Sequence, residues 1–140
     1  MTVADDTRPA PRSRAVRTAA QAGLALALVG AGTGHLTTLR QEFQAQVPPC
    51  VPLDPDLVVL ASGVVELALG GALLLTWRQP ARAVTGATTA AFFVADFPGD
   101  VSQLLTRTDA FGLDSDTARV VRLLFQPALV AWALRGTGAW

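Results

Sequence analysis

Apolar residues gather into four long runs, which are separated by segments rich in proline and charged side chains. The most continuous run, residues 57–75, contains a single ionisable side chain, Glu66. As a helix this run would span roughly 28 Å, about the thickness of the hydrocarbon core of a bilayer. A charged carboxylate at that depth costs at least about 2.5 kcal/mol. Glu66 is therefore expected to face a polar partner on another helix.

The hydrophobic pattern predicts an all-α fold in which four transmembrane helices form one bundle. The helices are expected at about residues 18–37, 56–77, 81–97 and 118–136. The third is the weakest span, and Pro98 is expected to stop or kink it because proline lacks the N–H that a helix needs. Residues 1–17 predict a disordered, arginine-rich cytoplasmic tail, and residues 18–136 predict one membrane domain. Residues 1–34 alone would also fit a secretory signal, but the apolar runs that follow favour a first membrane helix.

Small residues within these runs predict close contacts between helices. Gly30 and Gly34 form a G-x-x-x-G pair, a spacing that lets a second helix approach closely in lipid. In the third run, alanine recurs every fourth residue from Ala83 to Ala95. This stripe is also expected to pack against a neighbouring helix.

Composition and charge narrow the function classes. Hydrophobic residues make up 51% of the chain, and the formal net charge is zero, so nothing indicates a nucleic-acid partner. Cys50 is the only cysteine, which excludes an internal disulfide. One histidine and one cysteine are too few for a transition-metal site built from those ligands.

The distribution of arginine predicts the orientation in the membrane. With four spans, one side of the membrane would hold the N-terminal tail, the turn at residues 78–82 and the C-terminus. The arginines of that side are Arg8, Arg12, Arg14, Arg17, Arg78, Arg82 and Arg135. The loops of the other side carry most of the acidic residues. The positive-inside rule therefore predicts that both termini are cytoplasmic.

Most of the polar side chains within the predicted helices fall in the outer half of the bundle. They are His35, Glu66, Asp96, Arg119, Arg122 and Gln126. The three on the last helix have the spacing i, i+3, i+7, so they share one face. We expect Glu66 to pair with Arg122, Arg119 to reach the lipid headgroups, and Asp100 to lie in a loop.

Two interpretations of this polar cluster remain open. In the first, the charges neutralise one another and fix the register of the helices. In the second, they line a pocket open to the outer leaflet, where His35 is the group able to titrate near neutral pH. A quinone headgroup would suit such a pocket, since His or Arg donates to a carbonyl and a carboxylate handles the proton. The residues identify no cofactor, and none is a redox centre on its own.

Residues 20–136 resemble the DoxX family of small four-helix bacterial membrane proteins. The resemblance rests on Ala31-Gly32-Thr33-Gly34-His35-Leu36, Pro49-Cys50-Val51-Pro52, Ala61-Ser62-Gly63-Val64-Val65-Glu66-Leu67, Phe97-Pro98-Gly99-Asp100, and Arg122 followed by Gln126. Leu36 and Asp100 depart from the family, whose members often have Phe and Asn there. The resemblance implies a multi-pass protein of the bacterial plasma membrane, similar to a membrane subunit of a thiosulfate–quinone oxidoreductase.

Three functions are compatible with these observations. The chain could be a membrane subunit of a redox assembly, bound to lipid and to redox partner proteins, with a quinone in its polar pocket. It could instead be a non-catalytic scaffold or accessory protein, or a pathway for protons or a small solute. A homo-oligomer fits each of them, and none requires the chain to be an enzyme on its own.

Overall fold

Within residues 11–140, the part of the chain that the computed structural model describes, there are five helices and no strand. The helices are α1 (Pro11–Leu36), α2 (Arg40–Gln44), α3 (Pro55–Leu75), α4 (Ala81–Thr106) and α5 (Asp116–Thr137). The all-α prediction is therefore confirmed, with a short helix, α2, added between the first two long ones.

Three of the helices are long and apolar enough to cross a membrane, which indicates a membrane protein. They are the segments Arg12–Leu36, Pro55–Leu75 and Asp116–Thr137. The helix α4 is also long, but it is not among the segments apolar enough to cross, in agreement with its ranking as the weakest predicted span. All four long helices expose large apolar side chains, among them Leu26, Val64, Val94 and Leu124. Such a surface is typical of contact with lipid or with another protein.

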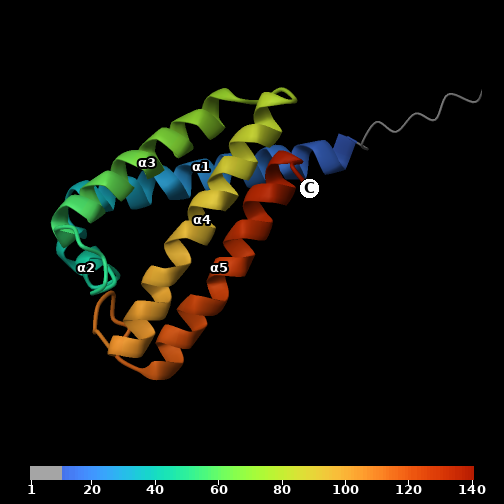
Figure 1. The fold of residues 1–140 in the computed structure, drawn as a ribbon. Coiled ribbons are helices and arrows are strands. Elements are labelled where there is room, and N and C mark those ends of the chain that lie inside the picture. Colours follow the sequence, from blue (N-terminus) through green and yellow to red (C-terminus); the bar gives the residue numbers. More distant parts are fainter. Residues whose placement is uncertain (1–10) are drawn as a thin grey trace, which may run out of the picture.

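The long helices pack as two pairs, α1 with α3 and α4 with α5 (Figure 1). The pairs approach each other near the chain's C-terminus and diverge towards the opposite end, where α2 lies between them. Contacts between the pairs run from α1 to α5 and from α3 to α4. We call the first region the closed end and the second the splayed end.

Glycine brings α1 and α3 together, although at other positions than the predicted pair. A Cβ on Gly63 would lie 2.7 Å from the Cβ of His35, and a Cβ on Gly32 would lie 2.7 Å from the carbonyl oxygen of Gly63. Gly30 faces open space, and Gly34 contacts only Leu39 of the following turn. The G-x-x-x-G prediction was therefore wrong about which glycines form the contact, because the facing side of α1 is rotated away from Gly30.

The alanine stripe of α4 does not pack as predicted either. Ala87, Ala91 and Ala95 are exposed, while the adjoining face of α4 buries Gly86, Thr89, Ala90 and Phe93. That face joins the apolar core, which also contains Leu24, Ala25, Leu28, Leu69, Leu73 and Ala133.

Two predicted boundaries were wrong. The helix α1 begins at Pro11, so the predicted disordered tail does not extend to residue 17; residues 1–10 lie outside the described part of the chain. Proline fits the first turn of a helix, where no N–H donor is needed.

The helix α4 continues through Pro98 to Thr106. The lost hydrogen bond costs about 3 kcal/mol, and hydrogen bonds from Gln126 to Asp100 and from Gln46 to Gln103 in the next turn offset part of it.

Candidate functional site

A polar cavity of about 180 Å³ lies between the two helical pairs, towards the splayed end. Five of the six predicted site residues line it: His35, Glu66, Asp96, Arg122 and Gln126. Its apolar walls come from α1 and α5, with Phe43 and Phe93 closing two sides. The space would hold roughly six water molecules. The structure therefore brings five of the six residues to one space, although not in the predicted pairing.

His35 and Glu66 form a buried pair across the α1–α3 contact. Nδ1 of His35 lies 2.7 Å from Oε2 of Glu66 and 2.9 Å from the carbonyl oxygen of Ala31. Because both neighbours accept hydrogen bonds, Nδ1 carries the hydrogen and donates, which leaves Nε2 of the neutral ring as an acceptor. The predicted pairing of Glu66 with Arg122 was wrong, since α3 packs against α1 and α4 but has no contact with α5.

A second polar group centres on Asp100 of α4, which is only 4% exposed. Nε2 of Gln126 donates to its Oδ2 at 2.5 Å, and Nη2 of Arg122 lies 3.5 Å from its Oδ1. Nε2 of Gln46, from the segment after α2, donates to the same Oδ1 at 3.3 Å. The assignment of Asp100 to a loop was wrong, because α4 continues through Pro98 and turns this carboxylate towards α5.

Arg119 lies outside the polar cavity. Its guanidinium pairs with Asp109 of the α4–α5 connection and, at 2.9 Å, with Asp116 at the start of α5. The side chain is 5% exposed, so these two acids hold it against the protein and the predicted reach to the headgroups was wrong.

Asp96 has no hydrogen-bond or ion-pair partner among the described residues. It lines the polar cavity and also a second, adjoining cavity of about 340 Å³, whose other walls include Ser62 of α3 and Gln46. His35 and Phe43 also line both spaces. Asp96 is thus an unpaired carboxylate between two cavities.

The charges of the site differ from the predicted balance of two acids and two arginines. The polar cavity is lined by two acids, Glu66 and Asp96, with one arginine and His35, and a third acid, Asp100, bonds to the lining residues Arg122 and Gln126. Within residues 11–140, no group of three or more His, Cys, Asp or Glu side chains is placed to hold a metal ion.

The connection between α1 and α3 supplies functional candidates that the sequence interpretation missed. Phe43 of α2 stacks on the His35 ring, with centroids 3.5 Å apart, and meets Phe111 edge-on at 4.6 Å. Glu42 accepts a hydrogen bond from the N–H of Phe111 at 2.5 Å. One signal was available, since Phe43 is the only aromatic residue between residues 37 and 56. This connection was expected only as one of the segments rich in proline and charged side chains.

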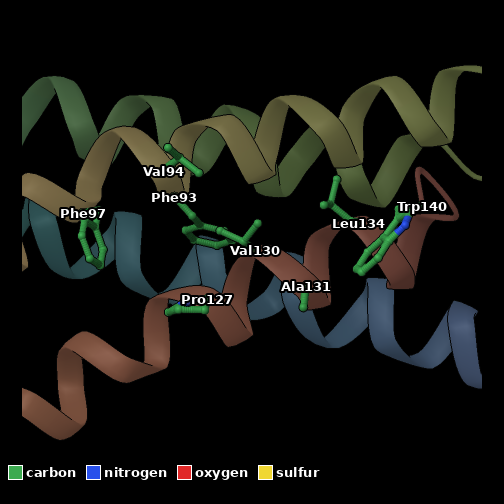
Figure 2. Close-up of a pocket in the computed structure, with 8 residues that line it drawn as sticks. All are labelled: Phe93, Val94, Phe97, Pro127, Val130, Ala131, Leu134 and Trp140. Carbon is green, nitrogen blue, oxygen red and sulfur yellow. The ribbon is translucent and has the colours of Figure 1, made fainter.

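An apolar groove of about 330 Å³ lies between α4 and α5, as Figure 2 shows. It is lined by Phe93, Val94, Phe97, Pro127, Val130, Ala131, Leu134 and Trp140. Phe93 lines both this groove and the polar cavity, so the two spaces adjoin at this side chain.

Comparison with known proteins places the chain in a family without assigning an activity. No curated protein and no solved structure matches the chain. The family model described as a domain of unknown function, DUF8561, matches residues 24–137. This stretch contains both groups of the polar cavity and the whole of the apolar groove except Trp140. The chain therefore belongs to the DUF8561 family.

Proposed function

We propose that this chain is a four-helix integral protein of the bacterial plasma membrane that binds a small quinone-type ligand. In this proposal it acts as the membrane subunit of a redox assembly, and the ligand's headgroup occupies the polar cavity. The observation that carries the proposal is Asp96, a carboxylate without a partner that lines two adjoining cavities beside His35. Asp96 is half-buried, and a polar group that is partly withdrawn from water without a protein partner is costly, so a bound ligand is a natural partner for this carboxylate.

The membrane placement of α4 rests on its neighbours. This helix packs along α5, and its polar residues Asp100 and Gln103 are buried against protein. Val84 and Val94 are exposed on its outer surface. We therefore assign α4 as the fourth span, with both termini on the cytoplasmic side as the arginine distribution favours.

The chemistry of the cavity suits a carbonyl ligand that exchanges protons. Reduction of a quinone to a quinol adds two electrons and two protons to its two carbonyl oxygens. Arg122 is able to donate hydrogen bonds to such oxygens, Nε2 of His35 does so when both ring nitrogens are protonated, and Asp96 is a group able to transfer a proton. The electrons would come from a redox partner protein, since the chain's own residues provide no redox centre.

The apolar groove supports a ligand with a lipophilic tail. Phe93, which Figure 2 shows in the groove, also lines the polar cavity, so a headgroup in the cavity could continue into a tail lying between α4 and α5. The resemblance to DoxX proteins points the same way, because it implies a relation to a quinone-linked membrane subunit.

A second candidate is a scaffold in which the polar cluster is purely structural. It is favoured by the pairing of the other buried polar groups, His35 with Glu66 and Asp100 with Arg122 and Gln126. In that case Asp96 would have no ligand to meet, and its substitution would leave all binding unchanged.

The test measures thermal unfolding of the purified full chain in detergent, with and without a quinone. A short-chain quinone at 100 times its Kd is expected to stabilise the protein by about 2.7 kcal/mol. Asp96→Asn should weaken binding of the reduced quinol about tenfold or more, because a quinol hydroxyl donates to the charged carboxylate and that hydrogen bond is weakened in the variant. Asp114→Asn removes the same charge from an exposed loop and should leave binding unchanged. Absence of stabilisation in the unmodified protein, or equal binding by Asp96→Asn, would contradict the quinone site.

A further inference from the structure

A cavity of about 580 Å³ at the closed end is lined mainly by arginine. Its lining residues are Arg14, Arg17 and Thr18 of α1, Trp77 and Gln79 of the α3–α4 connection, and Arg82 of α4. Arg14 and Arg17 are three residues apart on α1, so their side chains share one face. Three cations from two helices therefore converge on one space.

The charges of this arginine cavity are not compensated within the described part of the chain. No ion pair there involves Arg14, Arg17 or Arg82, and every ion pair of residues 11–140 lies in the polar cluster or at the splayed end. The sequence explains this separation, because residues 11–41, 67–95 and 117–140 contain no Asp or Glu. Like charges gathered without counter-charges repel one another, which favours an anionic ligand.

One member of the cluster is held in place by the protein. Nη2 of Arg82 donates to the carbonyl oxygen of Gly136 at 2.8 Å, while its Nε is buried with no hydrogen-bond partner. Nε2 of Gln79 donates to the carbonyl oxygen of Thr137 at 2.9 Å. The C-terminal end of α5 thus fixes two of the lining side chains and leaves a guanidinium donor unsatisfied.

We infer that the arginine cavity binds the phosphate group of an anionic phospholipid, an inference that rests on the proposed membrane placement. Guanidinium groups match the oxygens of phosphate in geometry and charge. Trp77 sets the depth, since tryptophan is enriched at the headgroup level and its indole N–H donates to Leu74 at the end of α3 at 2.6 Å. Basic pockets between membrane helices on the cytoplasmic side are suited to anionic headgroups.

The experiment measures lipid binding to the full chain in detergent by native mass spectrometry. Phosphatidylglycerol, phosphatidylcholine and inorganic phosphate are compared as probes. The chain should bind phosphatidylglycerol in preference to the other two. Each arginine near a lipid surface contributes about a fivefold change in affinity, so Arg17→Gln with Arg82→Gln should weaken phosphatidylglycerol binding about 25-fold. Arg12→Gln with Arg78→Gln removes the same charge from the same end outside the cavity, and should have a much smaller effect.

Each alternative outcome has a distinct meaning. Two outcomes would overturn the lipid inference and leave the membrane placement intact. One is equal binding of both lipids by membrane-inserted protein, and the other is an equal loss of affinity in the two double variants. Tight binding of inorganic phosphate would assign the cavity to a soluble phosphate compound and overturn the lipid. Binding that appears only after Asp5→Asn with Asp6→Asn would show that the chain's own acids fill the cavity. A chain recovered in the soluble fraction of cells would contradict the membrane placement itself.

Discussion

The closed end and the splayed end use polar residues for different purposes. At the closed end they satisfy backbone groups: Nε2 of Gln21 donates to the carbonyl oxygens of Leu73 at 2.7 Å and Thr76 at 2.9 Å, and the Thr137 hydroxyl donates to Ala133 at 2.7 Å. Towards the splayed end, side chains meet other side chains, and Asp96 meets none. Capping of this kind stabilises helix ends, whereas an incompletely satisfied network is costly unless it serves binding.

The contrast extends to packing. Gly86 lies so close to Thr137 that a Cβ would overlap its side chain, which lets α4 and α5 touch at the closed end. At the splayed end α2 and the residues after it fill the space between the helical pairs, and two cavities remain beside them. The molecule therefore has one end built for close packing and one that retains room for a ligand.

The largest expected effect is all-or-none and concerns which end faces the cytoplasm. A reporter enzyme fused after Trp140, at the closed end, should be active only in the cytoplasm. Cys50 near the splayed end is exposed, so a membrane-impermeant thiol reagent should label it in intact cells. Cys50→Ser is the control for labelling elsewhere. The reverse pair of signals would invert the orientation and place the arginine cavity in the outer leaflet.

The second prediction compares the packing of the two ends through glycine. Gly86→Ala should lower the free energy of unfolding in detergent by about 1–3 kcal/mol, the usual cost of overpacking a tight contact. Gly30→Ala is the matched control, because nothing lies within 4 Å of its added Cβ. It should stabilise the helix slightly, by about 0.4–1 kcal/mol, through the unfolded state. Equal effects at the two positions would mean that α4 and α5 do not touch at Gly86.

Much of the fold was predictable because a membrane helix needs a long apolar run, and such runs are visible directly. The position of a residue along its helix also follows from its number, which is why five of the six named residues line one cavity. The neighbours of each helix were not predictable in this way. Glu66 pairs with His35 and not with Arg122 because α3 lies beside α1, and the hydrophobic pattern alone does not specify which helices touch.

The continuation of α4 past Pro98 shows a second limit. Local preference favours a break there, yet the next turn is held by contacts that are distant in sequence, from Gln46 to Gln103 at 3.2 Å and from Gln126 to Asp100 at 2.5 Å. Asp100 was assigned to a loop for the same reason. Tertiary contacts of this kind override local helix propensity, and no local sequence pattern predicts them.

The smallest of the predicted effects tests the pairing near the splayed end. Arg122→Ala should lower the free energy of unfolding in detergent by about 1–2 kcal/mol, because Asp100 loses its cationic neighbour but keeps hydrogen bonds from Gln46 and Gln126. Arg122 is 31% exposed, which limits the loss. Adding Asp100→Asn to Arg122→Ala should restore part of the stability, with a coupling energy near 0.6 kcal/mol and not above about 1.7 kcal/mol.

The matched control adds Glu66→Gln to Arg122→Ala, and its effect should be additive, since Glu66 pairs with His35 across the α1–α3 contact. Thermal unfolding of the four proteins of each double-mutant cycle gives both coupling energies from one set of measurements. Recovery with Glu66→Gln in place of Asp100→Asn would mean that α5 is turned towards α3. The polar cavity would then hold a paired Glu66 and an unpaired Asp100, and the role given to Asp96 would have to pass to that residue.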